Sequence, residues 1–318
     1  MIGRVAISGS QGFIGSWVTR ACLDAGMKVH GIDNFRTGRR EFAPDSDNYR
    51  LFEGDILNTE FLMQAFDGCD WVIHLAANPD ARGERRGVDF NIRQNILGTA
   101  SVLDAMQHVG TTRILYASSA SIYGNTPETP TPEDFRSVPQ ASFYGASKLA
   151  AEGFIGAYCE MYGFTGILGR WVHILGPRYL HGHIIDFIRK LRRDPSRLYI
   201  LGDGRQAKSG LHAANLADGL LLAMQTHDFN EGVCEPYNFG GDTLLEVQDS
   251  AKLIAERLGV SPKLEFSGRL NGGWAGDNAN LVLDSTKIRN LGWKPTMSVP
   301  DGIACTVDWL ISSDCQYL

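Results

Sequence analysis

A glycine-rich turn near the start of the chain constrains its fold more than any other feature. Residues 8–16 read SGSQGFIGS, and they stand between a short apolar run and a stretch with apolar side chains at helical spacing. The turn therefore joins a buried strand to a helix. In such a turn Gly9 permits the tight bend, Gly12 lets backbone N–H groups approach a pyrophosphate, and Gly15 lets the helix pack closely on the strand.

A carboxylate follows where a dinucleotide-binding unit needs one. A second apolar run, residues 28–32, ends at Asp33, about 20 residues beyond the turn, where a carboxylate accepts hydrogen bonds from the adenosine ribose. The turn and this carboxylate together predict a bound dinucleotide. The negative charge also repels a 2′-phosphate, so Asp33 favours NAD, although Arg36, Arg39 and Arg40 leave NADP as an alternative.

Strand and helix patterns alternate through the first half of the chain without a regular internal period. This alternation predicts a parallel, doubly wound α/β sheet. In such a sheet the carboxyl ends of the strands line the ligand crevice. Further strands are expected at 49–53, 71–75 and 113–117, and helices at about 58–66 and 88–108.

Two short segments follow strands at this crevice. Asp55 either accepts from the adenine amino group, with Ile56 packed on the ring, or caps the helix that begins near residue 58. From the sequence alone, these two interpretations of Asp55 are equally favoured. Ala76 and Ala77 are small enough for the cofactor diphosphate and the nicotinamide ribose to lie close against them.

Tyr144, Lys148 and Ser119 are the candidates for the chemistry. Tyr144 and Lys148 are four residues apart at the start of an expected helix, so the ammonium can lower the phenol pKa, normally ~10. Ser119 follows a strand and is expected to bond the same substrate hydroxyl and pass its proton to Tyr144. On spacing alone an ordinary helical pair is the better interpretation. The glycine turn reverses that preference.

Composition indicates a globular protein with a small-molecule ligand. The 318 residues, 43% of them hydrophobic, suffice for one large or two ordinary domains. Without a membrane-spanning apolar run or room for a signal peptide before the first strand, we expect a cytoplasmic protein. A net charge of −6 without basic clusters argues against nucleic acid or a membrane as partner. The cysteines and the histidines at 173, 181 and 183 lack metal-ligand spacing, so no metal is predicted.

At these residues the chain resembles the extended short-chain dehydrogenase/reductases, in particular their NAD-dependent nucleotide-sugar epimerase/dehydratase branch. The resemblance extends essentially from end to end, and it implies NAD and a Rossmann sheet with a smaller α/β substrate-binding domain. It is carried by the glycine turn and by DNFRTG at 33–38, GDI at 54–56, HLAA at 74–77, Asn95, SSASIYG at 118–124, Tyr144-x-x-x-Lys148, GPR at 176–178, GDG at 202–204 and LGWKP at 291–295.

The resemblance also implies a role for each matched residue. Tyr144 is then the acid/base, Lys148 holds the nicotinamide ribose, and Ser119 contacts the sugar hydroxyl that is oxidised. The cofactor site would include Gly9, Gly12, Phe13, Ile14, Gly15, Asp33, Asn34, Arg36, Thr37, Gly38, Asp55, Ile56, Leu75, Ala76, Ala77, Asn95, Ser118, Tyr144, Lys148 and Val172. The nucleotide sugar would contact Arg82, Ser119, Ser121, Tyr144, His173, His183, Ile184, Tyr199, Lys208, Arg269 and Asp277.

The two residues after Ser119 favour epimerisation over the related reactions. Dehydratases of this branch place Asp-Glu there and decarboxylases retain the glutamate, whereas this chain has Ala120 and Ser121. We therefore expect epimerisation at C4 of a nucleotide hexose, with UDP-glucose and UDP-galactose as the pair, through a 4-keto sugar. UDP-glucuronate or a UDP-N-acetylhexosamine is the alternative substrate, and a non-catalytic NAD-sensing protein is the alternative class.

The second half of the chain departs from the family pattern at three positions. His173 stands for an asparagine that contacts the nucleotide sugar. Lys208 stands for an arginine that binds the diphosphate, keeping the charge without the bidentate fork. Trp274 stands for a second such arginine, so either Arg269 substitutes for it or the phosphates are held differently.

The resemblance also predicts how the chain is divided and assembled. Residues 1–170 would form the NAD-binding domain, with 208–241 partly folding back onto it, and residues 171–207 and 242–318 the substrate domain. The expected helices near 88–108 and 143–162 carry apolar residues on more than one face. This suits a four-helix homodimer interface, although burial within one chain explains it equally well.

Overall fold

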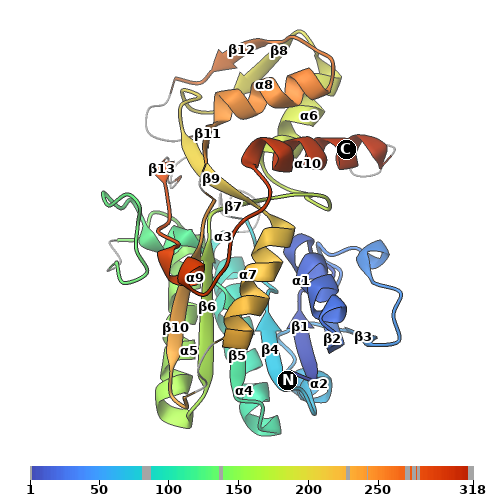
Figure 1. Ribbon diagram of the computed structural model, residues 1–318, viewed down its shortest axis with the longest axis vertical. Coiled ribbons are helices and arrows are strands. Elements are labelled where there is room, and N and C mark those ends of the chain that lie inside the picture. The colour runs from blue at the N-terminus through green and yellow to red at the C-terminus, as the bar shows by residue number, and fades with distance from the viewer. Residues whose placement is uncertain are drawn as a thin grey trace.

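Alternating strands and helices build one seven-stranded sheet, which confirms the predicted doubly wound α/β fold (Figure 1). The computed structural model describes residues 2–80, 87–135, 139–226, 230–241, 243–268, 273, 277 and 280–313. Neighbouring strands of the large sheet all run parallel. Their order is β10 (Cys234–Phe239), β6 (Thr165–Trp171), β5 (Arg113–Ala117), β4 (Trp71–His74), β1 (Arg4–Ser8), β2 (Lys28–Asp33) and β3 (Tyr49–Glu53).

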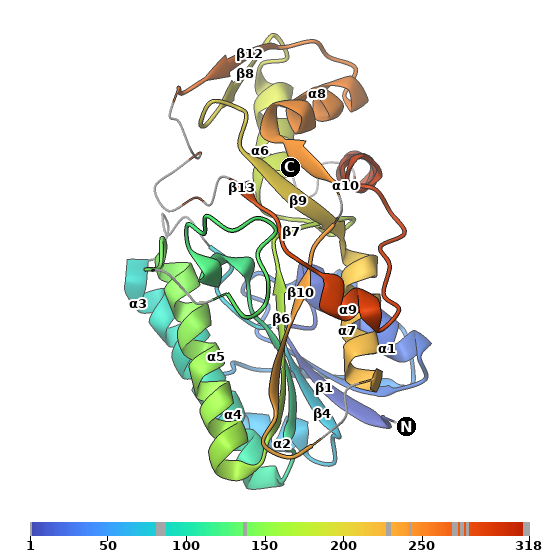
Figure 2. The same cartoon turned by 60° about the vertical axis from the view of Figure 1, so that its left-hand side comes forward.

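Side chains of the central strands point alternately into two cores, one on each face of the sheet. Val5 and Ile7 of β1 join one core, whereas Ala6 between them joins the other. Figure 2 shows the helix layers that cover the two faces. The first core is covered by α1 (Phe13–Asp24) and α7 (Ala213–Thr226), and the second by α2 (Thr59–Phe66), α4 (Gly98–Val109) and α5 (Phe143–Tyr162).

Much of the second half forms a smaller α/β part with its own core (Figure 1). β9 (Ala207–His212) pairs with β7 (His173–Leu175), β11 (Leu244–Glu246) and β13 (Asn280–Leu281). β8 (Arg197–Ile200) pairs in parallel with β12 (Lys263–Phe266). Apolar side chains of α6 (His183–Arg193), α8 (Val247–Arg257) and α10 (Val299–Ser312) fill this core. Between these segments the chain returns to the large sheet, because α7 contacts α1 and β10 pairs with β6.

The stretch expected as one helix at 88–108 is divided into three elements. These are α3 (Gly87–Asn91), the π-helix η2 (Ile92–Leu97) and α4. Asn95 of the π-helix is buried, accepts from the Asn78 backbone N–H (2.7 Å) and donates to the Ser147 hydroxyl (2.9 Å). These bonds hold the π-helix between a loop after β4 and the start of α5, and π turns of this kind occur often at functional sites.

Three short elements complete the description: η1 (Arg40–Phe42), η3 (Ala120–Tyr123) and α9 (Thr286–Asn290). The η3 turn directly follows the end of β5, so it lies at the carboxyl edge of the large sheet. Across the described ranges, no helix is long and apolar enough to cross a membrane.

Candidate functional site

The glycine turn leaves no room for a side chain at its first and third glycines. Gly9 has a φ of +74°, and a Cβ built there would lie 2.8 Å from the Ala76 backbone nitrogen. A Cβ at Gly15 would lie 1.9 Å from the Gly9 carbonyl oxygen. Glycine is therefore required at both positions for the turn to reach β4 and for α1 to pack on the turn.

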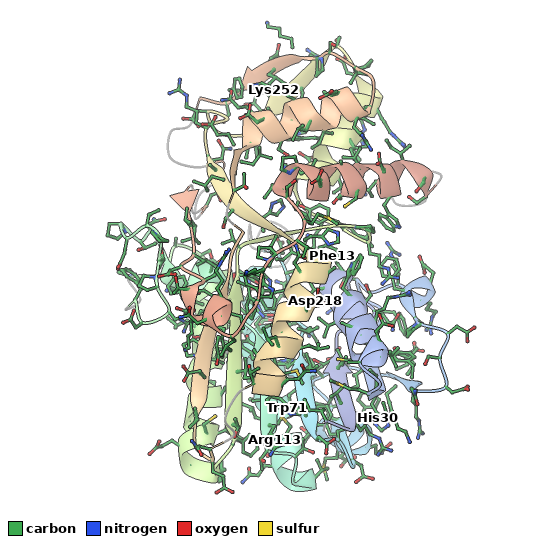
Figure 3. The ribbon with its side chains drawn as sticks, viewed as in Figure 1. Phe13, His30, Trp71, Arg113, Asp218 and Lys252 are labelled. Carbon is green, nitrogen blue, oxygen red and sulfur yellow. The ribbon has the colours of Figure 1, made fainter. Side chains whose placement is uncertain are left out.

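The amino end of α1 fits the pyrophosphate of a dinucleotide. Its N-cap is Gly12, no side chain caps it, and its first turn carries no acidic residue. The first N–H groups of a helix lack partners within the helix and carry partial positive charge, so they favour an anion. The residues present thus match the group that the sequence predicts, and Phe13 lies here at the junction with the smaller part (Figure 3), packed edge-on against Tyr179 at 5.5 Å.

Asp33 lies beside this turn, where the sequence places it. One carboxylate oxygen accepts from the Gln11 N–H (3.0 Å) and the other from the Phe35 N–H (2.8 Å). Burial raises the pKa of Asp33, and these backbone hydrogen bonds offset only part of the rise. A Cβ at Gly38 would lie 2.6 Å from the same carboxylate, so only glycine leaves space for it. The backbone N–H groups of Gln11 and Phe35 and the close approach of Gly38 thus hold this carboxylate in place, and cofactor contacts of Asn34 and Thr37 stay predictions.

Asp55 follows the end of β3, and its contacts decide between the two interpretations given above. The N-cap of α2 is Asn58, which accepts from the Phe61 N–H at 3.1 Å. Asp55 lies too early for that role, because α2 begins at Thr59; it accepts instead from the Leu57 N–H and the Asn34 side chain. The helix-capping interpretation of Asp55 is therefore wrong, and the adenine contact stays a prediction. Ile56 is buried in a core of the large sheet.

Two of the arginines that kept NADP as an alternative cofactor, Arg36 and Arg40, have partners within the protein. The Arg36 guanidinium lies over the Phe90 ring, 4.8 Å from its centre. Arg40 pairs with Glu53 at 2.6 Å and lies over the ring of Phe35.

The last residue of β4 is a buried histidine that sequence reasoning did not single out. His74 bonds through Nδ1 to the Ser8 hydroxyl (2.7 Å) and through Nε2 to Thr99 (3.1 Å). Burial lowers the pKa of His74 to about 3. This neutral imidazole ties β1 and β4 to α4, directly before the predicted cofactor residues Leu75, Ala76 and Ala77. A polar residue within an apolar strand was the signal that could have identified it.

Tyr144 and Lys148 lie together on α5, as their spacing predicts, but the ammonium has a different partner. Lys148 is 2% exposed, and its Nζ donates to the Ala117 carbonyl at 2.7 Å. It lies 5.9 Å from the centre of the Tyr144 ring. Burial lowers the pKa of Lys148 to about 7 and raises that of Tyr144 to about 12, while a hydrogen bond with Ser119 opposes the latter shift.

The serines after β5 lie close to this pair. The Ser119 hydroxyl bonds to the Ser121 hydroxyl at 3.1 Å and accepts from the Ser121 N–H. A hydrogen bond also joins Ser119 to Tyr144. That both contact one substrate hydroxyl stays a prediction. The Ser118 hydroxyl donates to Glu152 on α5, so it is engaged within the protein, and a cofactor role for Ser118 stays a prediction.

Two predicted substrate residues come together in the smaller part. The rings of His173 and His183 lie 5.0 Å apart; His173 bonds to the Tyr179 hydroxyl (3.3 Å) and His183 to the Ser250 hydroxyl (2.8 Å). Tyr179 in turn packs on Phe13. These contacts connect the predicted sugar site to the glycine turn.

The other predicted substrate residues are more scattered. Ile184 is fully buried in the core of the smaller part, whereas Tyr199 is 49% exposed on β8. Asp277 is buried and accepts from the Gly273 N–H. Val172, predicted for the cofactor site, packs beside η3. Arg82, Arg269 and Trp274, and the side chain of Lys208, lie outside the described residues.

Comparison with known proteins gives the site its context. A model of the NAD dependent epimerase/dehydratase family matches residues 5–240. A curated UDP-glucuronate 4-epimerase of Thermodesulfobacterium geofontis is 27% identical, covering 97% of this chain and 96% of its own. A crystal structure of a UDP-galactose 4-epimerase has a TM-score of 0.87 at 32% identity, and it covers 98% of this chain and 99% of its own.

The UDP-glucose 4-epimerase of Thermus thermophilus in complex with NAD has a TM-score of 0.86 at 27% identity, with the same coverage of both chains. These matches agree with the predicted family, the doubly wound sheet and NAD as cofactor. The protein is a nucleotide-sugar epimerase with NAD as its cofactor. The chain belongs to the NAD-dependent epimerase/dehydratase family.

Proposed function

We propose that the enzyme interconverts UDP-glucose and UDP-galactose by epimerisation at C4 of the sugar. The observation that carries this proposal is the side-chain set around Tyr144. Ser119, Tyr144 and Lys148 gather at the carboxyl edge of the large sheet, the edge at which the glycine turn leaves β1. Ala120 and Ser121 stand where elimination would need a carboxylic acid pair. The names of the UDP-glucose and UDP-galactose 4-epimerases similar to this chain support the choice of substrate.

The proposed roles follow from the positions of these groups. Tyr144 takes the proton of the C4 hydroxyl and returns it to the inverted alcohol, and Ser119 orients that hydroxyl through its own bond to Tyr144. Lys148 orients the nicotinamide ribose and supplies positive charge. When bound, NAD accepts hydride from C4 and returns it to the opposite face of the 4-keto sugar. The N–H groups of α1 and the Asp33 carboxylate would hold its diphosphate and its adenosine ribose.

One alternative substrate has a specific observation in its favour. The similar enzyme of Thermodesulfobacterium geofontis is named for UDP-glucuronate. Two histidines at the predicted sugar site, His173 and His183, could also bond a sugar carboxylate. A uronate is therefore the second candidate.

The assembly and division of the chain complete the proposal. Large apolar side chains are exposed on η2 and α5, and we propose that they meet those of a second copy in a cytoplasmic homodimer: Ile92, Leu97, Phe143, Phe154, Met161 and Tyr162. We further propose that residues 1–170 bind NAD and that 171–207 and 242–318 bind the nucleotide sugar. The contact of α7 with α1 and the pairing of β10 with β6 support our proposal that residues 208–241 fold back onto the first domain.

A substrate screen tests the proposal. UDP-, GDP-, CDP- and dTDP-sugars are incubated with the NAD-loaded protein, and the product is analysed for inversion at C4 together with the absorbance of NADH. We expect inversion of UDP-glucose and UDP-galactose. Faster inversion of UDP-glucuronate would move the proposal to the uronate. An inert complex with every sugar would favour the non-catalytic sensor.

A further inference from the structure

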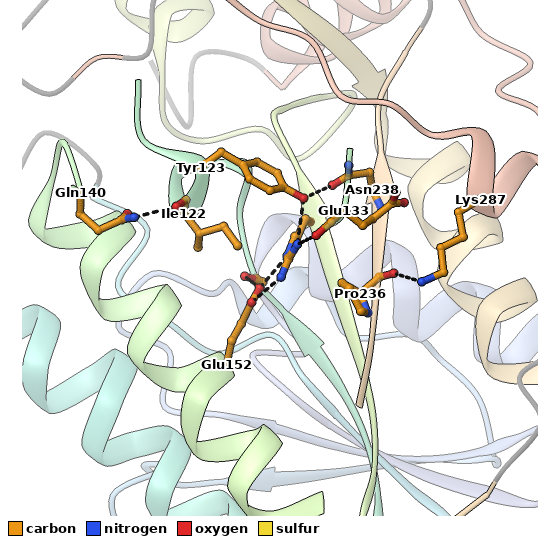
Figure 4. A network of polar contacts seen from close by, with 10 residues as sticks. Ile122, Tyr123, Glu133, Gln140, Glu152, Pro236, Asn238 and Lys287 are labelled. Carbon is orange, nitrogen blue, oxygen red and sulfur yellow. Dashed lines mark hydrogen bonds and ion pairs between the residues drawn. The ribbon is translucent and has the colours of Figure 1, made fainter. Parts of the chain in front are cut away.

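A buried ion pair joins Glu152 of α5 to Arg170 of β6, and Figure 4 shows it at the labelled Glu152. Arg170 donates twice to Glu152, from Nη2 to Oε2 at 2.7 Å and from Nε to Oε1 at 2.9 Å. Its Nη1 donates to the Tyr123 hydroxyl and to the Glu133 carbonyl. The side chains of Glu152 and Arg170 are only 6% and 10% exposed. Because the guanidinium is bonded on three sides, its position is fixed, and so is that of the carboxylate.

Glu152 contacts both segments that carry the proposed chemistry. It lies one helical turn after Lys148 and two turns after Tyr144, so the three side chains share one face of α5. Its Oε1 also accepts from the Ser118 hydroxyl, and Ser118 immediately precedes Ser119. The carboxylate therefore connects the helix of Tyr144 and Lys148 to the strand end that presents Ser119.

The groups that face Lys148 show what charge it experiences. Tyr116 of β5 lies with its ring centre 4.7 Å from Nζ, and burial raises the pKa of Tyr116, so it remains a neutral phenol. His74 of β4 is neutral because burial lowers its pKa to about 3. Burial also raises the pKa of Tyr144, and its hydrogen bond with Ser119 opposes the rise. Glu152 is the carboxylate among these described neighbours, and its negative charge opposes the lowering of the Lys148 pKa by burial.

We propose that Glu152 is a positioning residue for the acid/base group: held by Arg170, its carboxylate fixes the strand end at Ser118 and sustains the positive charge of Lys148. This inference rests on the roles proposed for Ser119, Tyr144 and Lys148. It predicts that Glu152 acts on turnover and on its pH dependence, because it touches neither sugar nor nucleotide in the proposed arrangement.

The test compares three variants of the NAD-loaded enzyme. Glu152→Gln keeps the shape of the side chain and removes its charge, so the alkaline limb of the kcat profile should move down by about one pH unit. At a pH above the alkaline limb, kcat of this variant should be about tenfold lower than that of the wild type, while KM stays within about twofold. Glu152→Gln with Arg170→Met removes both charges of the buried pair; it should recover thermal stability but keep a limb displaced in the same direction. The control is Glu235→Gln, which breaks the ion pair between Glu235 and Lys287. It should leave the alkaline limb of the kcat profile unchanged.

A second measurement separates this inference from the proposed function. The side-chain nitrogen of Lys148 is titrated by NMR in ¹⁵N-lysine-labelled protein, with Lys148→Met identifying its signal. In Glu152→Gln the titration should move to lower pH by about one unit, whether or not any sugar is turned over. If the wild type inverts no sugar but this shift occurs, the proposed function fails and the charge effect of Glu152 stands. An unmoved titration and an unmoved alkaline limb would overturn the inference, and Glu152 would then be a structural partner of Arg170 alone.

Discussion

Replacing Gly15 with alanine tests whether close packing in the glycine turn supports cofactor binding. The new methyl carbon would lie 1.9 Å from the carbonyl oxygen and 2.8 Å from the carbonyl carbon of Gly9. Both are backbone atoms, so no change of rotamer relieves the contact, and α1 must move by more than about 1 Å. Overpacking of this kind costs about 1–3 kcal/mol, and the better helix propensity of alanine returns at most about 1 kcal/mol.

The expected net loss of about 1–2 kcal/mol should lower Tm by roughly 1–3 °C for a chain of 318 residues. NAD binding should weaken as well, because the displaced Gly9 carbonyl also accepts from the Gly12 N–H at the cap of α1. We expect at least about tenfold weaker NAD binding by calorimetry, equivalent to about 1.4 kcal/mol. The control is Gly153→Ala in α5, where the structure places nothing within 4 Å, and alanine should raise stability by up to about 1 kcal/mol. Unchanged NAD affinity and Tm in Gly15→Ala would refute the reasoning.

Three further predictions address the chemistry, the cofactor and pH. Tyr144→Phe removes only the phenolic oxygen, so turnover should fall by about 10² or more while NAD and nucleotide-sugar binding survive; near wild-type turnover would eliminate Tyr144 as the acid/base. Asp33→Ala should weaken NAD binding, and wild-type affinity for NADP equal to that for NAD would contradict the role of this carboxylate. His74 binds its proton in the unfolded chain near pH 6.5 but in the folded protein only near pH 3, so the free energy of unfolding should fall as pH drops between these values. Urea unfolding at a series of pH values checks this slope, which His74→Asn should flatten.

Local patterns predicted the large sheet, whereas partners from separate segments stayed hidden. Apolar strands and helical spacing depend on neighbouring residues, so the doubly wound sheet and the shared face of Tyr144 and Lys148 followed from the sequence. The Ala117 carbonyl that binds Lys148 lies on another element, and no spacing rule connects the two. Asp55 and Asn58 are both good capping residues, and only the true start of α2 decides between them.

Glu152 shows the same limit more sharply. Its charge within a largely apolar helix predicts exposure, because carboxylates are seldom buried without a partner. Arg170 and Ser118 supply that partner from β6 and the end of β5, which only the folded sheet brings to α5. A buried network of this kind depends on tertiary position rather than on motif.

His173 offers a way to change substrate choice without changing the chemistry. It contacts Tyr179 and His183 in the smaller part. The core of that part is separate from the core of the large sheet that holds Tyr116 and Ala151. His173→Asn introduces the residue that the resemblance predicts at this position, so we expect altered KM ratios between UDP-hexoses and UDP-glucuronate. The pH profile of kcat should stay that of the wild type, because no element carrying Lys148 or Glu152 is touched. Equal changes in kcat for every sugar, with unchanged KM ratios, would instead place His173 in the acid/base group.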